Sequence, residues 1–389
     1  RVAFATAAVF LLNSTLIATW VSRLPATRDR LDLDPAEVGL TLLMTGLGSL
    51  VAMPFVGRLA ARWSSRPILV VVATICGLTL VALSVTPNAI TTGAVLFVFG
   101  AAYGSWDVAM NIQGSYVDRQ AGRDYMPRYH ASWSVGAAAG AGFGALMAAA
   151  GLGLTAHFAI VAAVACIGSI AIVLRLFVDD REPRSAAAVD EDAAGETVEK
   201  PHGRLLDRRL ILIGLITLCA CLLEGAAADW IALYLTDERQ ATEALAALGY
   251  GMWATAMALS RFSGTTLIGR LGRARAVRLA GAVVLAGVVA TLAAPGVYGA
   301  LVGVLLWGAG VALVFPASMS AGGETPGRAA DGIAAVSTIG YGGFLVGPPL
   351  IGLVANQVGL GTALWVLPVL ALGIVLLAPV VSPPKTPTS

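Results

Sequence analysis

The chain has 389 residues, of which 57% are hydrophobic and only 12% are charged, and its formal net charge is +2. A soluble globular domain carries about 25% charged residues, so this composition excludes an ordinary soluble protein and indicates an integral membrane protein. The near-neutral charge also argues against nucleic-acid binding, which depends on a strongly basic surface.

Twelve predominantly apolar stretches are each long enough to cross a bilayer as a helix, which takes about 20 residues. They lie near residues 2–22, 37–57, 68–86, 90–113, 131–150, 155–177, 210–235, 246–268, 277–294, 298–320, 332–355 and 361–381. The segments of about ten residues with alternating polarity that mark a transmembrane β-barrel are not visible. We therefore predict an all-α membrane protein with twelve transmembrane helices.

Basic residues predict the orientation of these helices. If both termini lie in the cytoplasm, all but four of the 25 Lys and Arg residues fall on the cytoplasmic side, the exceptions being Arg23, Arg28, Arg30 and Arg239. Cytoplasmic loops carry such an excess. We expect a multi-pass protein of the cytoplasmic (inner) membrane with both termini in the cytoplasm. Because the chain begins with Arg1 rather than Met, we also expect that its natural N-terminus has been trimmed.

A charged segment divides the chain into two halves. Residues 179–209 hold nine acidic and six basic side chains among Ala, Pro and Gly, without apolar periodicity. This composition is typical of a disordered segment, and we interpret it as a cytoplasmic linker. Six predicted spans precede it and six follow, so the expected domains are residues 1–178 and residues 210–389.

The two halves resemble each other in sequence. Residues 11–20 align with residues 221–230 at an offset of 210, residues 57–59 with 269–271 at 212, and residues 151–153 with 359–361 at 208. Three matches in the same order at corresponding helix ends indicate a duplicated unit. We therefore expect two pseudo-symmetric six-helix bundles.

A chain of two parallel six-helix repeats with a cytoplasmic linker resembles the major facilitator superfamily of secondary transporters. The resemblance implies a solute site near the membrane midplane, between halves that rock against each other. The loop from Gly57 to Arg66 (GRLAARWSSR) resembles a loop signature of the superfamily, although Ala61 replaces its usual Asp. Arg62 and Arg66 are candidate gating residues there, and the positive-inside rule explains their charges equally well.

Four further strings are similar to a largely uncharacterised bacterial branch of this superfamily, which lies loosely near the fucose-proton symporters. They are WVSRLP from Trp20, WDVAMNIQG from Trp106, MPRYHA from Met126 and LEGAAADW from Leu223. This resemblance covers nearly the whole chain and implies no particular solute.

Three carboxylates lie within apolar spans, where each charge costs roughly 2.5 kcal/mol or more. Asp107 lies in the fourth span and shares a helix face with Asn111. Glu224 and Asp229 lie in the seventh span, and their separation of five residues places them about 140° apart around the helix. All three are candidate proton-coupling residues. A structural hydrogen bond to a neighbouring helix is the alternative for Asp107.

We expect Glu224, near the middle of its span, to be the main proton-coupling group. Burial disfavours the charged form of a carboxyl and water favours it, so alternating access could load and release a proton. A permanent Arg partner would keep the group ionised. No Lys or Arg lies in the middle of a span, and Arg261, in the cytoplasmic half of the eighth, is the alternative partner and gating residue. We expect Asp229 to be a gate or a structural residue.

Other polar and aromatic side chains of the spans are candidate substrate-binding residues. They are Asn13, Thr19, Trp20, Tyr103, Asn111, Gln113 and Trp230. Interfacial anchoring is the alternative for the aromatic residues near span ends. His130 is a further gating or pH-sensing candidate. Gly136, Gly140 and Gly144 form a stripe that lets another helix approach closely.

These features predict a secondary transporter that moves a small organic solute by alternating access, coupled to protons. Its expected partners are the solute, protons and the lipid bilayer, and one chain should suffice to form the pathway, so we expect a monomer. Proton-driven efflux of amphiphilic or drug-like compounds is the alternative to uptake of a sugar-like or polar metabolite, and a transporter-fold sensor is a third possibility. An enzyme is not expected, because the chain has three His and neither an HExxH nor a GxSxG motif. The four Cys all lie within predicted spans, so we expect no disulfide, metal or cofactor.

Overall fold

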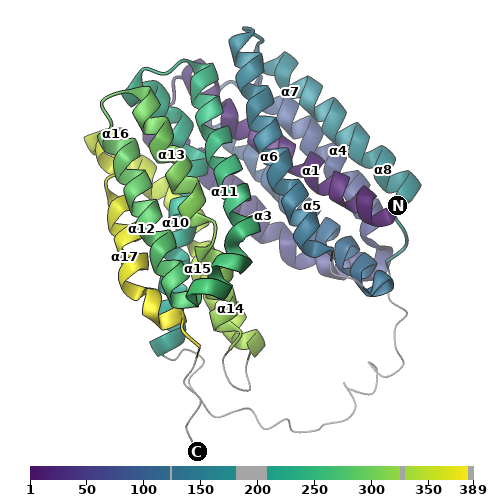
Figure 1. Ribbon diagram of the computed structural model, residues 1–389. Helices are drawn as coiled ribbons and strands as arrows, with labels where there is room; N and C mark the ends of the chain where they lie inside the picture. Colours follow the sequence, from purple (N-terminus) through teal and green to yellow (C-terminus); the bar gives the residue numbers. More distant parts are fainter. Residues whose placement is uncertain (123–124, 181–207, 325–328, 384–389) are drawn as a thin grey trace, which may run out of the picture.

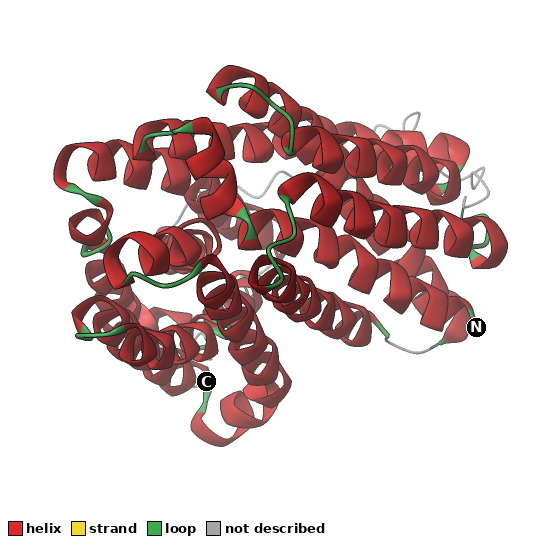
Figure 2. Cartoon of the chain, turned by 90° about the horizontal axis from the view of Figure 1, so that it is seen from above, coloured by secondary structure: helices red, strands yellow, loops and turns green. Residues whose placement is uncertain are grey.

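The computed structural model describes residues 1–122, 125–180, 208–324 and 329–383 (Figure 1). Over these residues the chain is helical, and no strand occurs in them (Figure 2). Most of the predicted linker lies outside the described residues.

The first six predicted spans correspond to helices on the right of Figure 1. They are α1 (Val2–Ser22), α3 (Pro35–Trp63), α4 (Ser65–Leu83), α5 (Ala89–Ala121), α6 (Met126–Ala149), and a continuous rod made of α7 (Leu154–Ala162), the π-helical turn η1 (Ala163–Ile167) and α8 (Gly168–Leu176). A short helix that the apolar pattern did not predict, α2 (Leu24–Leu31), connects α1 to α3. We call these the N-terminal helices.

The last six predicted spans correspond to helices on the left of Figure 1, which we call the C-terminal helices. They are α10 (Arg208–Arg239), α11 (Glu243–Leu271), α12 (Arg273–Ala293), α13 (Val297–Val311) with α14 (Val314–Gly322), α15 (Ala329–Val358), and α16 (Leu360–Ala363) with α17 (Val366–Leu377) and the 3₁₀ turn η2 (Ala378–Val381). Despite Pro348 and Pro349, α15 remains one helix.

Ten of these helical segments within the described residues are long and apolar enough to cross a membrane. The other two predicted spans are α6 and α11, helices of 24 and 29 residues whose sequences contain Arg, Ser and many Gly residues. These two helices pack against each other across the middle of the molecule. Their Arg, Ser and Gly residues account for their lower hydropathy.

Polar caps set several helix starts beyond the apolar stretches. Asp34 and Glu37 form a reciprocal capping box at the start of α3. Asn88 accepts a hydrogen bond from the Thr91 amide at 3.0 Å at the start of α5. Such side chains satisfy the amide groups that a helix leaves free at its N-terminus. The helices therefore begin before the apolar residues that predicted the spans.

The helix contacts repeat between the two sets. The close pair α1 and α6 corresponds to the pair α10 and α15, and α3 with α5 corresponds to α11 with α13. Helices α3 and α11 each have 29 residues and are offset by 208 positions. This offset equals one of the three offsets found in the sequence, so the internal repeat extends to the packing.

The glycine stripe of α6 is packed against α1, as the small-residue pattern predicted. A Cβ atom at Gly136 would lie 2.1 Å from the Leu11 carbonyl oxygen, and one at Gly140 would lie 2.9 Å from the Thr15 carbonyl oxygen. The absence of side chains lets the two backbones approach. The Thr15 hydroxyl also contacts the Gly136 carbonyl oxygen at 3.3 Å.

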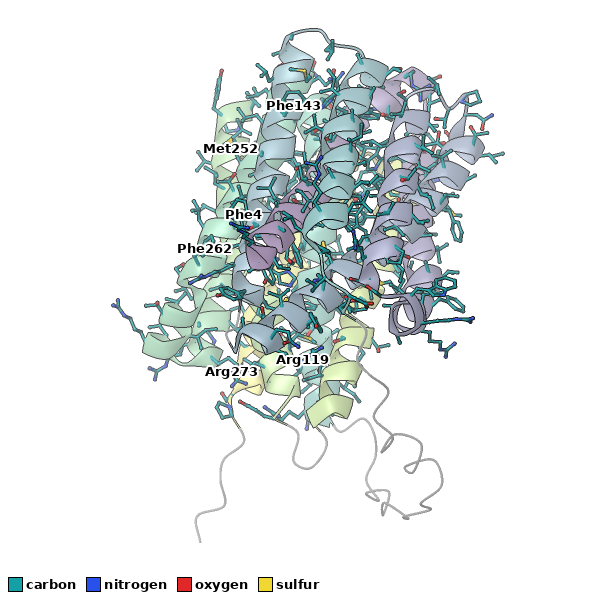
Figure 3. The ribbon with its side chains drawn as sticks, turned by 90° about the vertical axis from the view of Figure 1, so that its right-hand side faces the viewer. Phe4, Arg119, Phe143, Met252, Phe262 and Arg273 are labelled. Carbon is teal, nitrogen blue, oxygen red and sulfur yellow. The ribbon has the colours of Figure 1, made fainter. Side chains whose placement is uncertain are left out.

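Large apolar side chains cover much of the outer surface. Phe4 and Phe262, labelled in Figure 3, are 81% and 62% exposed. Arg119 and Arg273 lie at the lower end in the same view. An apolar belt with charges toward one end is the surface that a lipid bilayer requires.

Candidate functional site

The two sets of helices are closed against each other on one face of the molecule. We call this the far face, where α1 ends and α11 begins, and the opposite face, where α8 ends and α10 begins, the linker face. Near the far face, a Cβ atom at Gly39 of α3 would lie 2.5 Å from the Pro348 carbonyl oxygen of α15. One at Gly352 would lie 2.3 Å from the Pro35 carbonyl oxygen. The glycines therefore allow backbone contact between the two sets.

Two ion pairs also join the sets at the far face. The Arg28 guanidinium of α2 binds both carboxylate oxygens of Asp237 of α10, at 2.5 and 2.7 Å. Arg23, which is 4% exposed, has its Nε atom 2.5 Å from Glu243 Oε1 of α11. The hydrogen bonds to Asp237 raise the pKa of Arg28 above its ordinary value, which keeps the guanidinium charged.

Sequence reasoning missed these far-face contacts, although a signal existed. Arg23, Arg28, Arg30 and Arg239 are the four exceptions to the predicted charge bias, and each is held by a specific contact. Arg30 donates to the Thr86 carbonyl oxygen at 2.6 Å, and Arg239 donates to the Leu292 carbonyl oxygen at 2.6 Å. Of these four, Arg23 and Arg28 contact the other set of helices, whereas Arg30 and Arg239 contact their own set.

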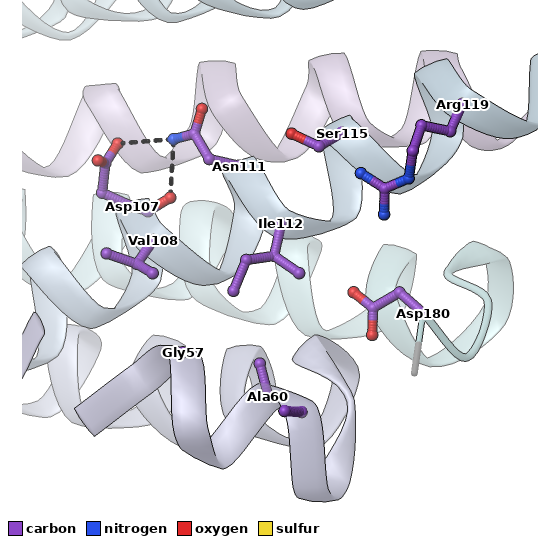
Figure 4. A pocket seen from close by; sticks show the side chains of 10 residues that line it. Gly57, Ala60, Asp107, Val108, Asn111, Ile112, Ser115, Arg119 and Asp180 are labelled. Atoms are coloured by element: carbon purple, nitrogen blue, oxygen red, sulfur yellow. Dashed lines mark hydrogen bonds between the residues drawn. The ribbon is translucent and has the colours of Figure 1, made fainter. Parts of the chain in front are cut away.

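A cavity of about 570 Å³ opens toward the linker face (Figure 4). Its lining includes Gly57, Ala60 and Ala61 of α3, Asp107, Val108, Asn111, Ile112, Ser115 and Arg119 of α5, and Asp180. The predicted shared face of Asp107 and Asn111 is present. Asn111 Nδ2 donates to the Asp107 carbonyl oxygen at 2.8 Å and lies 3.4 Å from its carboxylate (Figure 4).

Asp107 also interacts electrostatically with a residue of the C-terminal helices. Tyr341 of α15 interacts electrostatically with Asp107 and with Glu224. Tyr103, one turn before Asp107 on α5, interacts electrostatically with Asp107 and with Tyr250 of α11. Asp107 and Glu224 therefore both interact electrostatically with Tyr341.

Glu224 has a basic partner. Arg261 of α11 places its Nη2 atom 3.4 Å from Glu224 Oε1, and both side chains are partly exposed. Arg261, which the sequence analysis gave as the alternative partner of Glu224, is therefore its partner in the structure. Asp229, in contrast, makes no hydrogen bond or ion pair within the described part of the chain. The separation predicted from helix geometry thus gives the two acids different surroundings.

We predict that Glu224→Gln lowers thermal stability, because it leaves Arg261 without its carboxylate. A hydrogen bond to a charged group contributes about 1.5 to 3 kcal/mol, and partial exposure places the expected loss near the lower end. The melting temperature in detergent measures it.

The double variant Glu224→Gln with Arg261→Gln is the matched control. It should recover most of the lost stability, because two neutral amides can bond to each other. A double variant that is no more stable than the single one would show that the pair contributes little.

Aromatic side chains of α11 and α6 have defined partners. Tyr250 is stacked on Trp253, with ring centroids 5.9 Å apart, and interacts electrostatically with Asp229 and Glu224. From the N-terminal helices, Trp133 donates its indole N–H to Asn13 Oδ1 at 3.3 Å. Sequence reasoning named Asn13 as a candidate substrate-binding residue.

Four predicted substrate-binding residues lie elsewhere. Thr19, Trp20 and Trp230 are at most 2% exposed, and the Trp20 ring packs against Phe158, with centroids 6.5 Å apart. Gln113 is fully buried and contacts Ser65 at the linker face. In this conformation these four side chains are packed within the helices, so the structure does not bring them together with Asp107.

The predicted gating residues other than Arg261 have local contacts. Arg62 is placed over the Trp63 ring, 5.7 Å from its centroid. Arg66 donates to the Leu174 carbonyl oxygen of α8. His130 is exposed and meets Phe10 edge to face, with centroids 5.4 Å apart. The partners of Arg62 and Arg66 belong to the N-terminal helices, whereas His130 also interacts electrostatically with Arg261 of α11.

One structural acid at the linker face was missed. Asp180, which follows α8 and is 6% exposed, accepts a hydrogen bond from the Ser65 amide at 2.8 Å. When its amide group is turned so that nitrogen and oxygen exchange places, Gln113 also donates a hydrogen bond to Asp180 Oδ2, at 3.2 Å. Asp180 therefore supplies a carboxylate beside the α3 to α4 loop, where the sequence has Ala61 in place of the loop signature's Asp. Asp180 was counted among the charged residues of the predicted linker, so this hydrogen bond was not identified from the sequence.

The described residues hold no group of three or more His, Cys, Asp or Glu side chains placed to bind a metal ion. The four cysteines, Cys76, Cys166, Cys219 and Cys221, are free thiols and buried.

Comparison with known proteins identifies the family. The model of the Major Facilitator Superfamily matches residues 2–343. The chain belongs to this superfamily. It is 34% identical over 383 residues to the uncharacterized transporter y4wD of Sinorhizobium fredii, and this similarity covers 96% of each chain. The protein is thus a multi-pass membrane transporter, which is not a class of enzyme.

Solved structures show the same fold. The nucleoside transporter NupG matches with a TM-score of 0.72 and 17% identity, covering 97% of each chain. The transporter FucP, in its outward conformation, matches with a TM-score of 0.61 and 17% identity, covering 98% of each chain. At these identities the likeness extends to the fold and not to the solute.

Proposed function

We propose that the chain is a proton-coupled secondary transporter that carries a small organic solute by alternating access. Residues 1–178 and 210–389 form two pseudo-symmetric bundles of six spans each, joined by the linker. The repeated helix contacts support this division, because equivalent pairs occur in both sets. The bias of basic residues supports cytoplasmic termini in a bacterial inner membrane, and one chain supplies the whole pathway.

In this orientation the described state is open to the cytoplasm. The far-face glycine contacts close the outer side, and the cavity on the linker face opens inward. Rocking of the two bundles about the central region would break the far-face contacts. The solute site then lies between the bundles.

The single observation that carries the proton coupling is the position of Asp107. It is the only one of the three intramembrane acids among the residues that line the described cavity, and it has no basic partner in the described residues. A carboxyl in this place can release a proton to water in the inward-open state and take one up after the cavity closes.

The same reasoning changes the role proposed for Glu224. Its sequence-based priority depended on the lack of a basic partner, and Arg261 is such a partner. The ion pair joins neighbouring helices, so we propose that Glu224 and Arg261 hold α10 and α11 together. Asp107 becomes the first candidate for the transported proton, and Asp229 remains available for the solute.

The test uses protein reconstituted in vesicles with a solute identified by thermal-shift screening of sugars, organic acids and drug-like cations. We expect Asp107→Asn to reduce accumulation under a pH gradient to the level seen without a gradient. Exchange of preloaded solute should survive, because it needs no net proton movement. Asp32→Asn, an exposed position in a left-handed turn that Asn tolerates, is the matched control. Unaltered proton-driven accumulation by the Asp107 variant would contradict the assignment.

Export of an amphiphile is the second candidate. The aromatic chain of Phe315, Tyr341 and Phe344, with centroids 5.8 and 6.3 Å apart, favours it, because such rings bind apolar solutes without fixed polar contacts. Inside-out vesicles would distinguish the two directions: an exporter accumulates solute when the interior is acidic, whereas an importer driven by symport loses it.

A further inference from the structure

Four polar side chains follow one another along α5 at intervals of four residues. They are Asp107, Asn111, Ser115 and Arg119, and all four line the described cavity. Figure 4 shows them in a row along the helix. At a rise of about 1.5 Å per residue, the row extends about 18 Å along the helix axis. This length is more than half of the roughly 30 Å thickness of a hydrocarbon core, so the row leads from Asp107 to the linker face.

The Ser115 hydroxyl is free to face this cavity. A serine in the middle of a helix can donate a hydrogen bond to the carbonyl oxygen four residues earlier, and Ser105 of the same helix does so, to Ala101 at 2.7 Å. Ser115 is half-buried and makes no hydrogen bond to any described residue. Its hydroxyl therefore keeps its donor and its acceptors for molecules in the cavity.

The opposite wall of the cavity leaves room for water. It consists of Gly57, Ala60 and Ala61 of α3, and a Cβ atom at Gly57 would meet nothing within 4 Å. The cavity volume of about 570 Å³ far exceeds the roughly 30 Å³ that one water molecule occupies in the liquid. Water in a protein cavity also needs polar partners, and the row on α5 supplies them.

The cavity lies in one bundle. The described residues that line it belong to α3, to α5 or to Asp180, and none of the described residues of the C-terminal helices is among them. The solute, in contrast, passes between the two bundles in the proposed function. The cavity thus connects Asp107 with the linker face along a route that the solute does not need.

We propose that the polar row on α5 is the path by which the transported proton leaves Asp107 for the cytoplasm, separate from the path of the solute. The O–H bond of the Asp107 carboxyl breaks, a water molecule in the cavity takes the proton, and the carboxylate remains. The positive charge then passes through water along Asn111 and Ser115 to the linker face. Ser115 positions this water by donating and accepting hydrogen bonds. The proposal rests on the proposed proton coupling at Asp107 and specifies its route.

The first test measures access to the row from the cytoplasmic side. Inside-out vesicles are treated with a charged thiol reagent that does not cross membranes, trimethylammonium-ethyl methanethiosulfonate. Ser115→Cys and Asn111→Cys should react, whereas Met110→Cys, at a fully buried position of the same helix, should react at least about tenfold more slowly. The four native cysteines are at most 5% exposed. Equal rates at positions 110 and 115, or no reaction at position 115, would overturn the proposal.

The second test follows Asp107 itself and needs no solute. A water-soluble, charged carbodiimide joins a protonated carboxyl to the amine of glycine ethyl ester, and mass spectrometry measures the product at Asp107. Ser115→Leu should slow this reaction about tenfold, because an apolar side chain replaces water on the path of a charged reagent. Ser115→Thr keeps the hydroxyl and should react like the parent. Ala61→Leu narrows the same cavity from α3 and should also slow the reaction, which gives a second measurement if Ser115→Leu does not fold.

Transport separates the two routes. With the solute that tests the proposed function, Ser115→Leu should lose accumulation under a pH gradient and keep the exchange of preloaded solute. Loss of both would show that solute and proton share the path. Loss of neither, with an unchanged carbodiimide reaction, would show that the proton leaves elsewhere, and either result overturns the proposal. If Asp107→Asn instead leaves proton-driven accumulation unaltered, the proposed function itself fails, whatever Ser115→Leu does.

Discussion

Gly352→Leu should hold the far face of the transporter open. A Cβ atom at Gly352 would lie 2.3 Å from the Pro35 carbonyl oxygen and 3.1 Å from Gly39 Cα. Both are backbone atoms, which cannot move aside as a flexible side chain can. Overpacking of this kind costs about 1 to 3 kcal/mol, and about 1.4 kcal/mol changes an equilibrium tenfold. The bundles can avoid this cost by rocking apart, so we expect a shift of about fivefold or more away from the described state.

The measurement is the distance between spin labels at Val85 and Tyr298, which are 65% and 76% exposed and lie near the far face on different sets of helices. The native cysteines are at most 5% exposed and should not react. Gly342→Leu is the matched control in the same helix, because a Cβ atom there meets nothing within 4 Å. A distance that is unchanged in the Gly352 variant, or lengthened equally in the control, would contradict the prediction.

A similar steric change inside one bundle should act differently. Gly136 contacts the Leu11 carbonyl oxygen of α1, and this contact lies within the N-terminal helices. Gly136→Leu cannot be relieved by rocking the bundles. It should therefore lower the melting temperature without lengthening the distance between the labels.

Arg28→Glu should also open the far face, through charge. The variant replaces a bidentate pair with two carboxylates, because the new acidic side chain at position 28 then faces Asp237 across the two bundles. Arg28 and Asp237 have side-chain exposures of 20% and 34%, so we expect a loss of about 1 kcal/mol for breaking the pair and more for the added repulsion. The same spin-label distance should lengthen, and added salt should weaken the effect by screening the charges.

The charge-swapped double variant, Arg28→Glu with Asp237→Arg, should return the distance toward that of the parent. Asp29→Asn is the matched control, because Asp29 also contacts Arg28, at 2.7 Å, but lies in the same short helix. Removal of that contact leaves the two bundles joined. If the swap fails to restore the distance although both single variants alter it, the pair does not act as a gate.

The helices were largely predictable because their signal is local. An apolar stretch of sufficient length lowers its free energy by entering the bilayer, whatever its neighbours are. Even α6 and α11, the two least apolar of the predicted spans, are helices. The helix α2 was missed because eight residues with three charges carry no such signal. The shared face of Asp107 and Asn111 was equally local, since it follows from the helical period.

The roles of the charged residues were less predictable because they depend on partners from other helices. Glu224 was ranked first on the assumption that no base reaches it, whereas α11 brings Arg261 to 3.4 Å. Gln113 has the position of a pathway residue on α5 but contacts Ser65 at the linker face. Asp180 resembles an ordinary linker charge, yet it accepts a hydrogen bond from the Ser65 amide.

The two acids of α10 show which properties follow from the sequence and which depend on the tertiary structure. By itself, the amino-acid sequence determined the membrane class, the helices, their duplication and the presence of three acids in apolar surroundings, because transfer into lipid and helical periodicity act within one segment. The tertiary structure alone decided that Glu224 is paired, that Asp229 is not, that Asp107 lines a cavity, and that glycines and arginines close the far face. These outcomes depend on the rotation and close approach of different helices, and a buried charge takes its properties from the groups that this packing places around it.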